Sequence, residues 1–156
     1  MIEKYNESRH NPATVKDLLA MAMGRPKPER LQKLLDEFYS TDGHTIFVAL
    51  DKDNIAGIIG INHTAAPHGW ITHLAVHPEM RMKGIGKNLI NHTMEALSLK
   101  SLALETDQDA VEFYRACGFE IKEIESKWQG VRRFRCTKGH VPEFVLEYYN
   151  NFTLPV

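Results

Sequence analysis

A strand, a glycine-containing loop, a helix and a second strand follow one another between residues 71 and 106, and this order restricts the fold more than any other feature of the sequence. Residues 71–76 and 102–106 are short apolar runs typical of strands, and residues 85–99 repeat apolar side chains at helical spacing. The crossover predicts two parallel strands with a right-handed connection. Their carboxyl ends and the loop should then share the end of the sheet where ligands bind.

The loop at residues 81–86, Arg-Met-Lys-Gly-Ile-Gly, has the features of an anion site. A helix start leaves backbone N–H groups unpaired at the positive end of the helix dipole. Gly84 and Gly86 let the backbone approach a bulky anion, while Arg81, Lys83 and Lys87 add positive charge. This combination favours a diphosphate over a single carboxylate.

Two other phosphate-binding loops do not fit these residues. A P-loop needs glycine where Arg81 stands and Ser or Thr where Asn88 stands. A dinucleotide fingerprint needs a third glycine where the chain has Leu89. For the hexamer alone, the alternative is an ordinary glycine-rich helix start on a basic surface.

Two motifs together resemble the GNAT superfamily of N-acetyltransferases. The Arg-x-x-Gly-x-Gly loop resembles the coenzyme A pyrophosphate loop of that family. Residues 110–119, with Phe113-Tyr114 before Gly118-Phe119, resemble its second motif, a short helix that carries a tyrosine and closes with Gly-Phe. Order and spacing match, so the resemblance covers residues 71–119 and, loosely, the hairpin before them.

The resemblance implies an α/β (α+β) fold with a mixed, mostly antiparallel central sheet flanked by helices. We expect residues 1–156 to form a single N-acetyltransferase domain, with 141–156 as an apolar C-terminal extension. Periodicity and turn residues predict further elements. These are a short strand near residues 1–7, helices over 15–23 and 31–38, hairpins of 45–50 with 55–63 and of 120–125 with 131–137, and a helix capped by Asp109 and Glu112.

The resemblance further implies acetyl-CoA as cosubstrate and transfer of its acetyl group to a primary amine by direct attack in a ternary complex. The strand at 71–76 would part from the strand at 102–106 and pair with the pantetheine arm, which places the thioester between them. The implied cofactor-binding residues are Leu74, Ala75, Val76, Arg81, Met82, Lys83, Gly84, Ile85, Gly86 and Lys87.

One residue departs from the family pattern. Asp107 stands where the family often has an asparagine that touches the cofactor. A carboxylate near phosphates is repelled, so this contact is not expected here.

An amine attacks a thioester only when it is neutral, and an alkyl ammonium has a pKa near 10, so a base or a water chain must take its proton. Glu105 and His73 are the candidate bases, with ordered water as the third option. Tyr114 is the family's candidate donor to the departing thiolate. The structural alternatives are a solvent-facing Glu105, a hydrogen-bonded His73 within the sheet and a packed aromatic Tyr114.

Composition limits the partners and the location. The 19 basic and 20 acidic residues give a net charge of −1, so no overall field favours nucleic acid or a membrane. The first twenty residues hold no continuous apolar run, which predicts a cytoplasmic protein. Cys117 and Cys136 are interpreted as free thiols, and the scattered histidines predict no metal. The apolar tail should pack on the domain or on a second subunit, which permits a homodimer.

Three functions remain open at this stage. The first is an N-acetyltransferase acting on a small-molecule or peptide amine, with the two early helices as a lid. The second is a non-catalytic acyl-CoA-binding sensor or regulatory protein. The third is a dimeric scaffold whose loop binds any anion.

Overall fold

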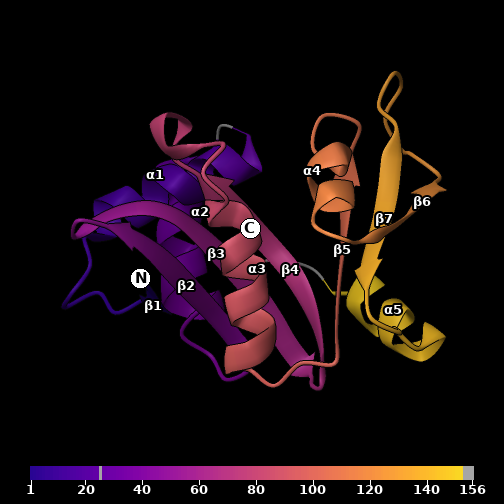
Figure 1. Cartoon of the computed structure of the whole chain (residues 1–156), viewed down its shortest axis with the longest axis horizontal. Coiled ribbons are helices and arrows are strands. Elements are labelled where there is room, and N and C mark those ends of the chain that lie inside the picture. Colours follow the sequence, from indigo (N-terminus) through magenta and orange to yellow (C-terminus); the bar gives the residue numbers. More distant parts are fainter. Residues whose placement is uncertain (25, 153–156) are drawn as a thin grey trace.

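The computed structural model describes residues 1–24 and 26–152. Its strands form one mixed sheet of seven strands, flanked by helices (Figure 1). Its strand order is β1-β2-β3-β4-β5-β7-β6, and every neighbouring pair except β4 with β5 is antiparallel. The predicted fold class is therefore confirmed. The strands are Ile2–Lys4 (β1), His44–Asp51 (β2), Asn54–Ala65 (β3), His68–Val76 (β4), Ser101–Asp107 (β5), Glu120–Ile124 (β6) and Arg133–Lys138 (β7).

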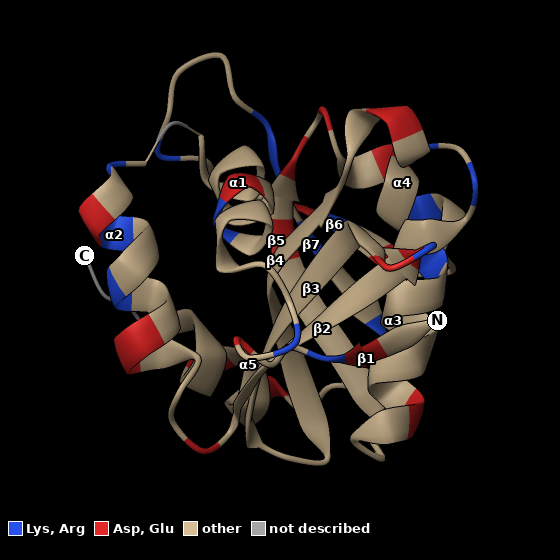
Figure 2. Ribbon diagram, turned by 90° about the vertical axis from the view of Figure 1, so that its left-hand side faces the viewer, with Lys and Arg blue, Asp and Glu red and all other residues tan. Residues whose placement is uncertain are grey.

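Helices cover both faces of the sheet, with α1 and α2 on one side and α3 and α4 on the other (Figure 2). None of the described helices combines the length and apolar character needed to cross a membrane. Arg25, at the predicted end of the first helix, and residues 153–156, which include Leu154 of the predicted extension, lie outside the described residues. The helices are Pro12–Met23 (α1), Pro28–Lys33 (α2), the π-helical turn Leu34–Phe38 (η1), the 3₁₀ turn Pro78–Met80 (η2), Ile85–Ala96 (α3), Val111–Ala116 (α4) and Glu143–Asn150 (α5).

Each face of the sheet has its own apolar core. Ile59, Ile61 and Leu102 pack with Leu89 and Ile90 of α3, and all five are fully buried. On the opposite face, residues of α1 and α2 pack against β2, β3 and β4. The main members of that second core are Val15, Leu18, Leu19, Leu31, Val48, Ile58 and Ala75.

The parallel pair β4 and β5 is joined only at its beginning. His68, Gly69 and Trp70 stand opposite Ser101, Leu102 and Ala103, and the pairing ends there. Beyond this point the two strands diverge toward their carboxyl ends (Figure 1). The sheet therefore opens at the end that carries the glycine loop.

The C-terminal helix α5 packs back on the same chain, with Val145, Leu146 and Tyr149 buried. The Tyr149 hydroxyl donates to the carbonyl oxygen of His68 at 2.6 Å, which fixes α5 near the paired end of β4. After α5, the ring of Phe152 lies 5.5 Å from that of Phe38 in η1. The apolar tail is thus connected to the early helices.

The predicted cap of the short helix α4 is wrong. Ala110 occupies the N-cap position and no side chain caps the helix. Glu112 instead pairs with Arg115 at 3.1 Å. The Asp107 carboxylate accepts a hydrogen bond from the backbone N–H of Asp109 at 2.9 Å. Asp107, two residues before the predicted cap Asp109, therefore orders this turn.

Candidate active site

The glycine loop presents unpaired backbone donors at the start of α3. Gly84 is the N-cap of α3 and adopts the left-handed conformation, with φ of +79°. Within the described residues, no backbone N–H from Arg81 to Lys87 donates a hydrogen bond, and the first helical donor is Asn88, which bonds the carbonyl of Gly84 at 3.0 Å. Such a cluster of free N–H groups at a helix N-terminus is suited to a phosphate.

The two glycines of the loop serve different purposes. A Cβ on Gly84 would meet no atom within 4 Å, so the space beside this residue is open. A Cβ on Gly86 would lie 2.7 Å from the ring of Phe113 in α4. Gly84 therefore leaves room for a ligand, whereas Gly86 permits close packing of α3 against α4.

Three cations of the loop are exposed and make no ion pair within the described residues: Arg81, Lys83 and Lys87. The Arg81 Nε donates to the carbonyl oxygen of Val76 at 3.1 Å, which ties the loop to the end of β4. Met82 is fully exposed and adopts a positive φ of 66°. The positive charge of the loop is thus free to meet an external anion.

The last part of β4 has one free edge. Leu74, Ala75 and Val76 stand opposite Ile59, Ile58 and Gly57 of β3, while on their other side the pairing with β5 has already ended. A strand edge of this kind binds an extended ligand through its backbone amides.

A β-bulge reshapes the middle of β4. Ile71 stands opposite Ile61 and His73 stands opposite Gly60, which leaves Thr72 as the extra residue. The Tyr39 hydroxyl, at the end of η1, bonds Thr72 Oγ1 at 2.6 Å and His73 Nδ1 at 2.5 Å. A Cβ on Gly60 would collide with this hydroxyl, so Gly60 is the residue that admits it. Sequence reasoning missed Tyr39 and Thr72, although a glycine inside a strand is a signal of such a close approach.

His73 is deeply buried, with 4% of its surface exposed. Burial, and secondarily the positive charge of Arg30 in α2, lower the pKa of His73 to about 4. The imidazole is therefore neutral at pH 7.

Glu105 lies on β5 just beyond the last residue that pairs with β4. Its carboxylate pairs with Arg135 of β7 at 3.0 Å, and their side chains are 21% and 18% exposed. Because the preceding Leu104 belongs to the core under α3 and α4, Glu105 points to the opposite face of the sheet. His73 faces that side too, through its bond to Tyr39.

Tyr114 projects from α4 into the core on the other face. Its ring packs edge to face on Phe113 and Phe119, with centroids 5.0 and 5.5 Å away. Within the described residues its hydroxyl makes no hydrogen bond. Burial raises the pKa of Tyr114 above its ordinary value, so the phenol stays protonated at neutral pH.

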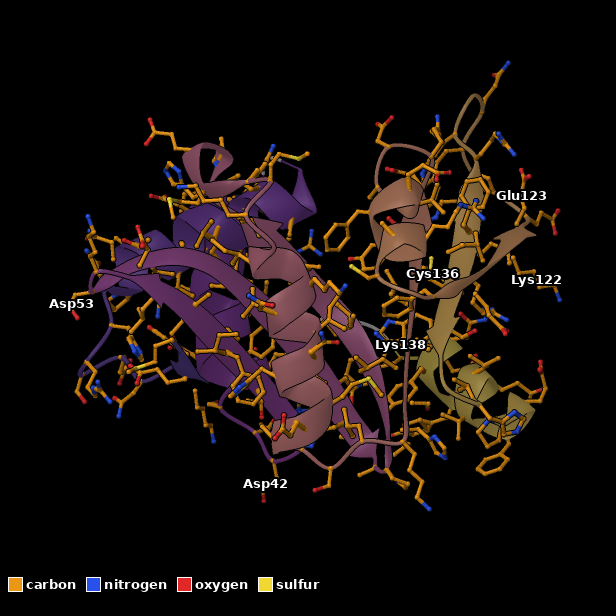
Figure 3. The ribbon with its side chains drawn as sticks, in the orientation of Figure 1. Asp42, Asp53, Lys122, Glu123, Cys136 and Lys138 are labelled. Atoms are coloured by element: carbon orange, nitrogen blue, oxygen red, sulfur yellow. The ribbon has the colours of Figure 1, made fainter. Side chains whose placement is uncertain are left out.

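Two thiols lie close to Tyr114 on the same side. Cys117 and Cys136 are buried and unbridged, and burial raises the pKa of both. Lys138, two residues after Cys136 on β7, donates to the carbonyl of Cys117 at 2.9 Å and so ties α4 to the sheet (Figure 3). No group of three or more His, Cys, Asp or Glu residues suited to a metal occurs in the described part of the chain.

Several solved structures share this fold. A coenzyme A complex of an aminoglycoside 6′-N-acetyltransferase superimposes with a TM-score of 0.68 at 17% identity, covering 92% of this chain and 98% of that one. A Bacillus subtilis acetyltransferase in complex with CoA gives 0.65 at 19% identity, covering 90% and 98%. The ribosomal-protein-alanine N-acetyltransferase from Brucella melitensis gives 0.69 at 15% identity, covering 90% and 99%. At these identities the likeness shows the fold.

The family is shown by the sequence itself. The curated proteins contain no match to this chain. The profile described as the acetyltransferase (GNAT) family matches residues 13–119, which include the bulged strand, the glycine loop and the Tyr114 helix. The chain is therefore an acyltransferase that belongs to the acetyltransferase (GNAT) family.

Proposed function

We propose that this enzyme transfers the acetyl group of acetyl-CoA to a primary amine by direct attack in a ternary complex. The supporting observation is that two sets of unpaired backbone groups occur at one end of the sheet. The N–H groups from Arg81 to Lys87 suit a diphosphate, and the free edge of β4 suits the amide-containing pantetheine arm.

The cosubstrate would be held by the residues of these two segments. Gly84 and its open space accommodate the diphosphate, with the free charges of Lys83 and Lys87 beside it. Ile85 and Gly86, the first residues of α3, follow Gly84 in the chain, and Arg81 and Met82 precede it. The arm runs along Leu74, Ala75 and Val76. Acetyl-CoA supplies the thioester: the amine nitrogen bonds its carbonyl carbon, and the C–S electron pair leaves on sulfur.

Of the two candidate bases, electrostatics favour Glu105. A proton on His73 would create a buried cation beside the charge of Arg30, which already opposes it. A proton on Glu105 would neutralise one member of the Glu105–Arg135 pair rather than create a second buried cation, so its cost is the loss of that ion pair. We infer that Glu105 accepts the amine proton, directly or through one ordered water.

Steady-state kinetics with acetyl-CoA and a panel of amines test the function, with thiol release and product mass as readouts. We expect intersecting initial-rate plots when both substrates are varied, because attack is direct. Parallel plots would indicate an acetylated enzyme, and binding of CoA without turnover of any amine would contradict the proposal.

Glu105→Gln should lower kcat/KM for the amine by about 10²- to 10⁴-fold, the usual contribution of a general base. Glu123→Gln is the matched control because it also removes an arginine-paired carboxylate, at 2.7 Å from Arg132, on the distant hairpin labelled in Figure 3. The control should retain full activity. Retention of full activity by Glu105→Gln would assign the proton to water or His73.

The chain's exposed apolar residues support a homodimer through its C-terminal region. Phe144 is 72% exposed on α5, beside the 44% exposed Tyr148. Light scattering should give twice the chain mass, and a mass reduced to that of one chain in Phe144→Ser would place the interface at α5.

Two buried free thiols, Cys117 and Cys136, are compatible with the reducing cytoplasm, which we propose as the location of this protein.

A further inference from the structure

Arg30 of α2 is a partly buried cation without a partner in the described chain. Its Nε is buried and makes no hydrogen bond. No described carboxylate lies within ion-pair distance of any of its guanidinium nitrogens. Burying part of a guanidinium with no acceptor is costly, so this arrangement needs an explanation.

Arg30 lies on the side of the sheet that α1 and α2 cover. Leu34, four residues later and therefore on the same face of the helix, is fully buried. The adjacent Leu31 packs in the core that contains Ala75 of β4. The guanidinium also lies close enough to His73 to contribute to the lowered pKa of that residue. Arg30 therefore lies on the side of the sheet toward which Glu105 points, and its charge acts on His73.

The carboxylates in this region are already engaged or turned outward. Asp36 accepts from Gln32, Glu37 lies 3.9 Å from Lys33, and Glu105 pairs with Arg135. Glu29 is exposed. Within the described residues, none of these carboxylates is therefore an ion-pair partner of Arg30.

We propose that Arg30 binds a carboxylate of the acceptor, so that the acceptor is an amine that also carries a carboxylate, such as an amino acid or a short peptide. This inference rests on the proposed function and names its substrate class. A guanidinium offers a planar, always charged fork that matches a carboxylate in two parallel hydrogen bonds. A bound carboxylate would supply the acceptor that Nε lacks, while Glu105 keeps its own partner, Arg135.

The test compares α-amino acids and dipeptides with their C-terminal carboxamides, in which the negative charge is removed at nearly constant shape. The parent enzyme should favour the carboxylates by about ten- to a hundredfold in kcat/KM, the range of one charge-assisted bidentate contact. Arg30→Gln should abolish this preference, and Arg30→Lys should restore it only in part, because lysine lacks the fork. Lys33→Gln, which removes an exposed cation from the same helix, should keep it.

Binding of CoA alone distinguishes whether Arg30 binds a carboxylate of the acceptor or a phosphate of the cosubstrate. We expect equal CoA affinity in the parent and in Arg30→Gln, since the diphosphate is held by the loop. A loss of CoA affinity with no change in the carboxylate preference would assign Arg30 to a cofactor phosphate and overturn the inference. Turnover without any carboxylate preference would overturn it too, while leaving the proposed function intact. Absence of turnover with every amine would overturn both.

Discussion

Gly84→Val should abolish the stabilisation of the enzyme by CoA. The parent, at a CoA concentration a hundredfold above the dissociation constant, should gain about 2.7 kcal/mol of unfolding free energy. For a domain of this size this corresponds to a rise in melting temperature of about 5–10 °C. The valine branch would occupy the open space beside residue 84, where we place the diphosphate, and would also disfavour the left-handed backbone that directs the free N–H groups outward.

Gly130→Val is a matched control for backbone strain. Gly130 has nearly the same φ, +76°, and also has no atom within 4 Å of an added Cβ, but it lies in the turn between β6 and β7. Both variants should lose about 1–3 kcal/mol of stability without ligand, because valine rarely adopts this conformation. Only Gly84→Val should lose the CoA shift. Equal shifts in both variants would show that the loop does not bind the diphosphate.

The loop could be predicted because its determinants are local. A helix start exposes N–H groups whatever the rest of the fold, and two glycines with three cations lie within seven residues. The parallel pairing of β4 and β5 was also predictable, since a strand–helix–strand sequence of this length permits little else. The number of residues between the two strands does not determine how far along their length they pair. Only the family resemblance implied that the strands part.

The remainder of the site depends on contacts between distant residues. Tyr39 reaches Thr72 and His73 across 33 and 34 positions of the sequence, and no periodicity reports such a contact. No sequence pattern singles out Arg30, and only the structure shows that its Nε is buried without a hydrogen-bond partner in the described chain. The error at the start of α4 has a local origin: Asp107 accepts from the backbone N–H of Asp109, and the sequence alone does not distinguish which of the two aspartates orders the turn.

Tyr114→Phe should lower the turnover number by about ten- to a thousandfold and leave CoA affinity nearly unchanged. The substitution keeps the ring that packs between Phe113 and Phe119 and removes only the hydroxyl. Because this hydroxyl bonds no described residue, the melting temperature should hardly change. Tyr149→Phe is the contrasting control: it removes bonds to His68 and Ala65 at the paired end of β4, so stability should fall while turnover is retained.

The burial of Tyr114 determines how its hydroxyl acts. A phenol with an ordinary pKa near 10 is already a weaker acid than a thiol near 8.5, which makes full proton transfer to the thiolate uphill by roughly 2 kcal/mol. Burial raises the pKa of Tyr114 further and increases this cost. The same shift keeps the donor protonated as the pH rises through 10, so the turnover number should show no alkaline decline from this group. We therefore expect Tyr114 to stabilise the developing charge on sulfur by a hydrogen bond, while water completes the protonation. An unchanged turnover number in Tyr114→Phe, with chemistry shown to be rate-limiting by single-turnover kinetics, would reduce Tyr114 to a packed aromatic of the core.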